Sequence, residues 1–272
     1  MNDLTVLSVG IMGALAVVFA AVLAFADKKL KVKEDPKVEE LNRLLPGVNC
    51  GACGFLSCRD FAEKIVTGEA DPAKCRVVDE ETAKKIFAIT GRSKGKVYPK
   101  LPLVYCAAEE ENKKPLAEYL GVRTCNAAKL IFGGGMECQY GCMGFGDCVE
   151  VCSFDALIMV KGLPRVDIKK CTGCAKCVKA CPRNIIEMAE KKNEKLFYVA
   201  CSSHDNALRV RKICGVGCIA CGICEKLSSE KFFVMKENLS RRDAAKHNKK
   251  DKQEEIEKIA GKCPTKVIKH LT

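Results

Sequence analysis

Closely spaced cysteines constrain the fold of this chain more than any other feature. Cysteine makes up 20 of the 272 residues. The densest run is Cys171-Thr-Gly-Cys174-Ala-Lys-Cys177-Val-Lys-Ala-Cys181-Pro182. In this C-x2-C-x2-C-x3-C-P spacing, three thiolates bind one [4Fe-4S] cluster and the cysteine before proline binds a second. The run therefore predicts a pair of iron–sulfur clusters within small cysteine-rich units.

Two other uses of many cysteines fit the pattern less well. Disulfide scaffolds are usually short secreted chains whose cysteines are spread out to cross-link distant loops, whereas the cysteines here are bunched. Structural zinc sites pair two C-x2-C units across a longer gap. A third cysteine and a Cys-Pro dipeptide at this spacing are not what tetrahedral zinc requires.

The net charge does not by itself indicate a nucleic-acid partner. The formal charge is +12. A cubane core of about +2 held by four thiolates carries about −2, so four clusters would reduce the net charge to about +4. The sequence also lacks basic stretches interleaved with stacking aromatic residues, which are typical of single-strand binding. We expect no nucleic-acid partner.

The N-terminal segment predicts a single-pass anchor in the inner or plasma membrane. Residues 4–26 carry no charge, and as a helix they would span about 34 Å, enough to cross a bilayer core. Lysines follow at 28, 29, 31 and 33, whereas Asp3 is the only charged side chain before the segment. The positive-inside rule therefore puts the N-terminus outside and the cluster domains in the cytoplasm. A signal peptide cleaved after Ala26 is the alternative, but the segment lacks a basic N-terminal region.

The strongest metal-site prediction is a central two-cluster unit. In such units the fourth ligands cross over between the two clusters. One cluster is predicted to bind Cys138, Cys142, Cys148 and Cys181. The other is predicted to bind Cys171, Cys174, Cys177 and Cys152.

The segments between these cysteines predict an α+β fold with ferredoxin-like modules. Residues 156–160 and 165–168 flank a turn at 161–164 and predict a hairpin, and residues 184–188 and 195–200 repeat the pattern. The first half has looser cysteine spacing, and Ser153 stands where proline is usual. The loop around Cys142 would be larger and would open that cluster to a partner.

A further cluster is predicted near the N-terminus. Its ligands would be Cys50, Cys53, Cys58 and Cys75, with zinc as the alternative metal. Residues 38–45 and 59–67 predict short helices on either side of the cysteine loop.

The C-terminal module predicts one more cluster, for about four in total. A tight triplet with a remote Cys-Pro gives Cys218, Cys221, Cys224 and Cys263 as its ligands, with Cys214 an alternative to Cys263. Residues 241–258 are highly charged and predict a solvated helix.

Six residues of metal-binding type have no assigned site. For Cys106 and Cys125, buried free thiols are slightly favoured over ligands or a redox pair, and Cys201 has no evident role. The three histidines are isolated in the sequence and are predicted to lie at the surface: His204, His247 and His270.

Motifs for other chemistry are missing from the sequence. No G-x-G-x-x-G follows a strand, and there is no P-loop or nucleophile elbow. The chain is therefore predicted to carry electrons without a nicotinamide or flavin site of its own.

The cysteine modules suggest a linear organisation. The predicted parts are an anchor at 1–27, a linker and short helix at 28–45, and an N-terminal 4Fe-4S domain at 46–90. They continue with a connecting region at 91–135, in which 133–135 form a flexible joint or tight turn. A two-cluster ferredoxin-like domain at 136–200 and a single-cluster extension at 201–272 complete the chain.

Taken together, these residues resemble the B-subunit family of Rnf complexes, membrane-bound ferredoxin:NAD oxidoreductases that translocate Na⁺ or H⁺. The resemblance covers nearly the whole chain. Its specific features are the apolar N-terminal helix, Leu44-Leu-Pro-Gly-Val-Asn-Cys-Gly-Ala-Cys-Gly54, and Cys138-Gln-Tyr-Gly-Cys-Met-Gly-Phe-Gly-Asp-Cys148. No Ser-Gly-Ala-Thr flavinylation motif occurs, which fits the B subunit and not the flavin subunits.

The resemblance implies a subunit that accepts low-potential electrons from soluble ferredoxin. It would pass them to membrane and flavin-bearing partners, with NAD reduced on a different subunit. A polyferredoxin subunit of another membrane oxidoreductase, of the hydrogenase or formate dehydrogenase type, is the alternative.

Overall fold

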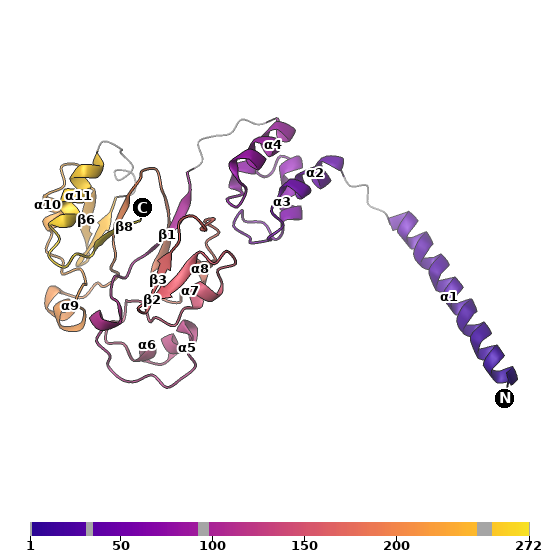
Figure 1. Ribbon diagram of the computed structural model, residues 1–272, viewed down its shortest axis with the longest axis horizontal. Coiled ribbons are helices and arrows are strands. Elements are labelled where there is room, and N and C mark those ends of the chain that lie inside the picture. The colour runs from indigo at the N-terminus through magenta and orange to yellow at the C-terminus, as the bar shows by residue number, and fades with distance from the viewer. Residues whose placement is uncertain (1, 31–34, 92–97, 244–251, 272) are drawn as a thin grey trace.

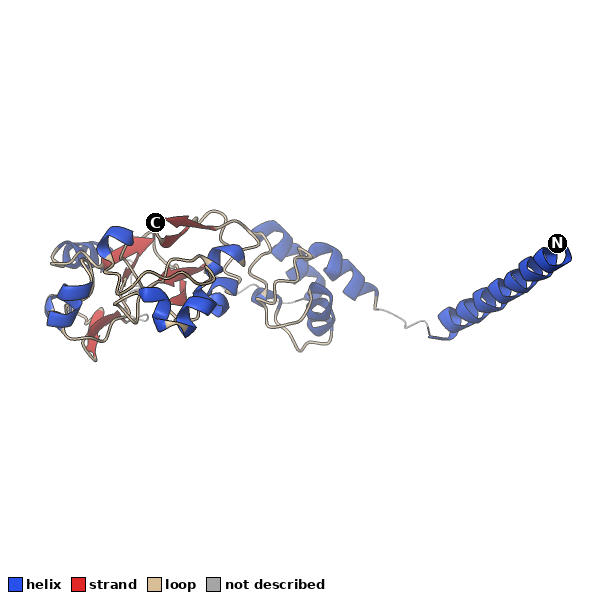
Figure 2. Cartoon of the chain, turned by 90° about the horizontal axis from the view of Figure 1, so that it is seen from below, coloured by secondary structure: helices blue, strands red, loops and turns tan. Residues whose placement is uncertain are grey.

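Short helices and two-stranded antiparallel sheets make up the fold. The structure is a computed structural model that describes residues 2–30, 35–91, 98–243 and 252–271. Figure 1 shows α1 (Asn2–Leu30) at one end, a small helical unit next to it, and the strands at the other end. Figure 2 shows the same order from below. The predicted α+β class is confirmed.

The first helix is long and apolar enough to cross a membrane, as predicted. No side chain from Val6 to Lys29 is buried within the protein. Lys28 and Lys29 lie in the last turn of α1. An uncovered apolar helix of this length is suited to a lipid environment, where its backbone hydrogen bonds are satisfied internally.

The N-terminal unit is a cluster of short helices around the first cysteines. Its elements are α2 (Pro36–Leu44), α3 (Cys58–Val66), the 3₁₀ turn η1 (Pro72–Lys74) and α4 (Glu80–Thr90). The core consists chiefly of Leu41, Phe61, Ile65 and Ile86, each at most 3% exposed. The two helices predicted here are confirmed as α2 and α3.

One antiparallel strand pair is a tight hairpin. β2 (Leu157–Val160) and β3 (Leu163–Val166) make the predicted hairpin. Its turn consists of Lys161 and Gly162 alone, both at positive φ of 47° and 70°, the geometry of a tight hairpin turn. The turn is therefore shorter than predicted, and β3 begins at Leu163.

The second predicted hairpin is wrong. β4 (Ile186–Glu190) pairs with β1 (Lys100–Val104), and β5 (Leu196–Val199) pairs with β8 (Ile268–Leu271). Every residue of β5 is buried, as are Leu101 to Val104 of β1. Strands buried this fully need partners and cover from distant segments, which a local pattern cannot reveal.

These pairings cross two of the predicted domain boundaries. β1 comes from the predicted connecting region but joins a sheet with β4. β5 and β8 join residues on both sides of the boundary at 200. The connecting region also contains η2 (Glu110–Asn112), α5 (Cys125–Leu130) and α6 (Phe132–Gly135), and α6 contains a tight turn at Gly133 and Gly134. α7 (Asp147–Glu150) and α8 (Lys176–Ala180) carry central cysteines.

The C-terminal part has its own core. Its elements are α9 (Ala207–Ile213), α10 (Ile223–Lys226), β6 (Phe233–Lys236), β7 (Leu239–Arg242) and α11 (Gln253–Gly261), besides β8. Phe232, Phe233, Leu239 and Ile256 are fully buried between them.

The helix predicted over 241–258 is wrong at its start. Arg241 and Arg242 belong to β7, where they pair with Val234 and Phe233 of β6. Residues 244–251 lie outside the described part of the chain, and α11 begins at Gln253. His204 and His270 are exposed, as predicted, and His247 is outside the described residues.

Candidate metal centres

The cysteines gather in groups that line shared space. All 20 are free thiols. Among the described residues, no three His, Cys, Asp or Glu side chains form a group suited to a single metal ion. The groups must therefore be judged by which thiols are neighbours and which cavities they line.

The N-terminal group brings together the four predicted cysteines. Cys53, Cys58 and Cys75 pack against the helical core. Burial raises the pKa of Cys75, and neighbouring Cys53 and Cys50 raise it further, whereas backbone N–H groups of Val77 and Val78 lower it. Backbone donors aimed at sulfur are the usual support of a cluster ligand.

The tight loop of the densest run also gathers its predicted partners. Burial raises the pKa of Cys177 to about 12, and Cys174, Cys171 and Cys152 add to the effect. The backbone N–H of Ala156 donates to Sγ of Cys152 at 3.4 Å. Cys152 thus reaches this loop from the end of α7, in the crossed arrangement that the spacing predicts.

The remaining central cysteines lie around a cavity, here called the first cavity, whose lining differs from the predicted ligand set. It is lined by Cys125, Cys142, Cys148 and Cys181. Cys138, predicted as a ligand here, does not line it. Burial raises the pKa values of Cys142 and Cys148 to about 12, and Cys125 is among the neighbours that raise both further.

Asp147 fixes Cys125 beside Cys148. Its Oδ1 accepts the backbone N–H of Cys125 at 2.6 Å, and its Oδ2 accepts from Asn126 N–H at 3.1 Å and Nδ2 at 2.9 Å. Asp147 is 8% exposed and directly precedes Cys148. Burial alone would raise its pKa, but the donors from Cys125 and Asn126 outweigh burial and the pKa is lowered. The carboxylate therefore ties the start of α5 to the start of α7.

A second cavity lies on the other side of Cys142. Its walls come from segments far apart in the sequence. The cysteines that line it are Cys106, Cys138, Cys142, Cys201 and Cys214. Cys106 and Cys201 were not predicted as ligands, and Cys214 lies here and not with the C-terminal triplet.

Arg183 supplies positive charge between the two cavities. It lines the first cavity, and its Nη1 donates to the carbonyl oxygen of Cys138 at 2.9 Å. Nη2 donates to the carbonyl oxygen of Gly133 at 3.1 Å. Burial lowers its pKa, and the thiols around it, Cys138 first, act in the opposite direction. A guanidinium here suits anionic groups on both sides.

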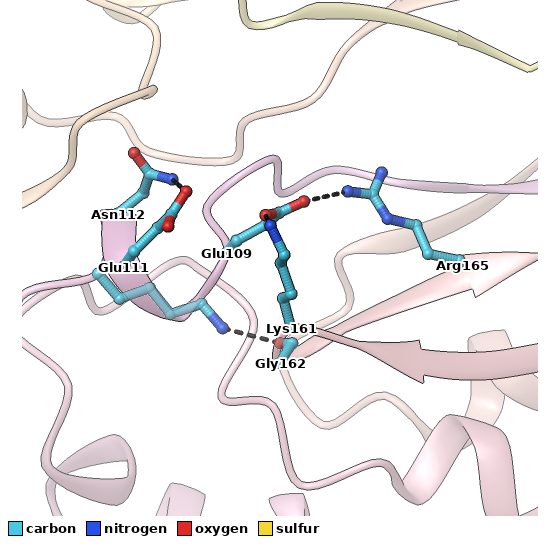
Figure 3. A network of polar contacts seen from close by, with 7 residues as sticks. Glu109, Glu111, Asn112, Lys161, Gly162 and Arg165 are labelled. Carbon is cyan, nitrogen blue, oxygen red and sulfur yellow. Dashed lines mark hydrogen bonds and ion pairs between the residues drawn. The ribbon is translucent and has the colours of Figure 1, made fainter.

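A group of polar contacts fastens the segment after Cys106 to the β2–β3 hairpin. Glu109 Oε1 accepts from Arg165 Nη2 at 2.6 Å, and Lys161 Nζ is 3.4 Å from Oε2 (Figure 3). Lys113 Nζ donates to the carbonyl oxygen of Gly162 at 2.9 Å. The hairpin turn thus positions residues 106–113, which form one wall of the second cavity.

The C-terminal group contains the remaining cysteines. Burial raises the pKa of Cys224; the Ser240 hydroxyl, 3.1 Å from its Sγ, lowers it, and Cys218 and Cys221 raise it. Cys224 and Cys263 both pack against the core that includes Cys218. Cys263 therefore shares a core with two members of the triplet, Cys218 and Cys224.

The donor set fits iron–sulfur chemistry. Thiolates are the ligands of [4Fe-4S] clusters, and each group offers at least four cysteines within small, largely apolar surroundings. Thiols with a raised pKa must lose their protons when a metal group binds, so binding and proton release are coupled.

Comparisons with known proteins point the same way. Residues 45–77 match a family profile described as an Fe-S cluster, and residues 163–186 match a 4Fe-4S binding domain. The first matched segment holds Cys50, Cys53, Cys58 and Cys75, and the second holds the dense run.

Three relatives are similar over most of this chain. The B subunit of the Na⁺-translocating ferredoxin:NAD⁺ oxidoreductase complex of Acetobacterium woodii is 38% identical over 77% of this chain, which spans 63% of that relative. The B subunit of an ion-translocating oxidoreductase complex of Methanosarcina acetivorans is 36% identical, covering 83% of this chain and 85% of the relative. The B subunit of the proton-translocating ferredoxin:NAD⁺ oxidoreductase complex of Clostridium ljungdahlii is 33% identical, covering 76% and 73%.

Proposed function

The chain belongs to the B subunits of Rnf-type ion-translocating oxidoreductase complexes, and we propose that it is the subunit through which electrons enter such a complex. Reduced soluble ferredoxin is the donor in this proposal. Flavin-bearing and membrane subunits are the acceptors, and NAD is reduced on another subunit. The names of two relatives specify Na⁺ and protons respectively, so either ion is compatible with the proposal.

This proposal rests on one observation: the segment that matches a 4Fe-4S binding domain is also the segment whose thiols lie close together. The matched segment 163–186 contains the tight loop, and Cys152 is a neighbour of Cys171 and Cys177 from outside the matched segment. A bound [4Fe-4S] cluster supplies one-electron redox chemistry.

Four ligand groups are part of the proposal. Three consist of Cys50, Cys53, Cys58 and Cys75; of Cys152, Cys171, Cys174 and Cys177; and of Cys218, Cys221, Cys224 and Cys263. The fourth consists of Cys142, Cys148 and Cys181 with either Cys138, as the spacing predicts, or Cys125, which lines the same cavity.

The chain's own residues would hold and tune these groups. Backbone N–H donors to sulfur, such as Ala156 to Cys152, stabilise the thiolate form and shift the reduction potential. Buried neighbours such as Tyr198 and Ile186 keep water away from the central thiols. Low exposure and N–H donors together set the relative potentials along the chain.

Membrane attachment through α1 is also proposed, with the N-terminus outside and the cysteine-rich part in the cytoplasm. Lys28 and Lys29 at the end of α1 support this orientation because basic residues favour the cytoplasmic side. Soluble ferredoxin would then have direct access to the cysteine-rich part.

Substitution of Cys177 tests the proposed function. In the native complex, Cys177→Ala removes one ligand of the tight loop, so we expect about 4 fewer iron atoms per chain. NAD reduction by reduced ferredoxin should fall by about tenfold or more, since even the loss of support around a metal ligand costs that much. Val151→Ala, at an exposed apolar residue beside Cys152, is the matched control and should change neither quantity.

Undiminished ferredoxin-driven NAD reduction in a Cys177→Ala complex that has lost iron would reject this route. Co-purification of the variant with the other subunits, measured in the same sample, shows that the loss is not one of assembly.

A further inference from the structure

The second cavity has the features of a metal site. Five cysteines line it, and one of them, Cys142, also lines the first cavity. Among the described residues, four cysteines line the first cavity, so a four-thiolate group there requires Cys142. Four thiols then remain for the second cavity.

We propose that Cys106, Cys138, Cys201 and Cys214 bind a fifth [4Fe-4S] cluster, and that Cys125 takes the position in the central pair predicted for Cys138. The central cluster would then be held by Cys125, Cys142, Cys148 and Cys181. This inference rests on the proposed iron–sulfur function and extends it to residues that the local motifs leave out.

Close approach of the chain between two thiols supports the new site. A Cβ atom on Gly141 would lie 3.4 Å from Sγ of Cys138 and 3.6 Å from Sγ of Cys106. The two sulfurs therefore flank the same glycine, although 31 positions separate their residues in the sequence.

The other two thiols are brought in by one short helix. Cys201 precedes α9 and Cys214 follows it directly. Val210 and Ile213 of α9 line the cavity and are 1% and 2% exposed. The N–H of Ser203 donates to Sγ of Cys201 at 3.4 Å, a contact of the kind that supports cluster sulfur.

Backbone contacts close the cavity from the side of residues 106–113. The backbones of Lys113 and Cys214 form an isolated antiparallel β-bridge. Next to it, the N–H of Gly215 donates to the carbonyl oxygen of Asn112 at 3.1 Å. Lys113 also lines the cavity. With Arg183 near Cys138, two cationic side chains are available to offset the charge of about −2 that a cluster with four thiolates carries.

Cys125 is equally well fixed in the first cavity. Asp147 holds its backbone beside Cys148. Lys129, in the same helix α5, donates through Nζ to the carbonyl oxygen of Pro182 at 2.6 Å, next to Cys181. Both ends of α5 are thus attached to segments that carry ligands of this group.

The fifth site connects the central pair to the C-terminal group. Cys142 lies between the first and second cavities. On the far side, the backbone N–H of Cys218 interacts with the Cys201 thiol. The assignment uses every one of the 20 cysteines in groups of four and leaves no thiol without a role.

An iron and sulfide inventory of the anaerobically purified full-length protein tests the proposal. We expect about 20 iron and 20 labile sulfide per chain, whereas the local motifs alone give about 16 of each. A count of about 16 iron, or zinc in place of the additional iron, overturns the fifth cluster. If no iron is bound at all, the proposed function fails as well, so the two failures are distinguishable.

Paired substitutions test which cysteines act together. Cys106→Ala with Cys201→Ala should cost about 4 iron atoms, because both thiols serve one cluster, whereas Cys125→Ala with Cys138→Ala should cost about 8. If the motif-based ligand set holds instead, the first pair costs none and the second about 4. Leu208→Ala, exposed on α9 and outside the cavity, should keep the full count. The wild-type inventory decides the cluster number even if a double variant fails to fold.

Discussion

The tight loop from Cys171 to Cys177 and the cavity around Cys106 and Cys201 each gather several cysteines, but the sequence distances between those cysteines are very different. In the loop, three thiols lie within seven positions of one another. Around the cavity, the thiols come from the segment after β1, from the segment before Cys142, and from both ends of α9. A local group can form with little folded structure, whereas a dispersed one exists only after the sheets have assembled, since long-range closure has to be offset by packing.

A substitution in the buried core next to the dispersed cysteines is expected to have the largest effect on stability. Leu103 in β1 is fully buried, three residues before Cys106. Leu103→Ala should lower the free energy of unfolding by about 2–5 kcal/mol. Iron should be lost from the dispersed groups before the tight loop, as measured by iron content and EPR during urea titration.

Ile158→Ala is the matched control, because Ile158 is 56% exposed on the β2–β3 hairpin. It should change stability by no more than about 0.5 kcal/mol. Simultaneous loss of all clusters in Leu103→Ala would remove the distinction between local and dispersed groups.

A smaller effect is expected from the carboxylate that attaches Cys125. Asp147→Ala leaves three donors from Cys125 and Asn126 without their acceptor. The free energy of unfolding should fall by about 1–3 kcal/mol. Glu150→Ala, at an exposed residue of the same helix α7, should have little effect.

The Asp147 contribution should also depend on pH. Its folded-state pKa is lowered, chiefly because the donors from Cys125 and Asn126 outweigh burial. The stabilisation is therefore fully present above the unfolded value of about 3.9 and is lost as the pH falls through the lower folded value. Urea unfolding of wild type and Asp147→Ala at neutral and acidic pH measures this; a difference that grows as the pH falls would contradict the assignment.

The smallest effect is expected in the N-terminal unit, where the cysteine loop is held by local structure. Ser57 caps α3 by accepting the N–H of Asp60 at 3.0 Å. Ser57→Ala should cost about 1 kcal/mol, and Ser57→Asn, which retains a good cap, should restore most of it. Thermal unfolding of the N-terminal unit provides the measurement, and equal losses in both variants would show that the cap does not stabilise this loop.

Local patterns predicted the local structure well. The hairpin at 157–166 and the helices α2 and α3 were predicted from periodicity and turn residues. The second hairpin was not, because β4 and β5 pair with β1 and β8, which lie far away in the sequence. The charged stretch near Arg241 was assigned to a helix because charge patterning says nothing about the buried Leu239 that begins the strand.

The sequence by itself determined the chemistry of this protein: an apolar helix at its start, thiols in numbers and spacings suited to iron–sulfur clusters, and membership of a family of electron-transfer subunits. Tertiary structure alone decided which thiols face one another. Cys125 stands beside Cys148 because a buried carboxylate holds it there, and Cys106 meets Cys138 because two strands and a hairpin bring their segments together. Spacing along a chain measures proximity only over a few residues; beyond that range, the packing of the core sets the distance between two sulfurs.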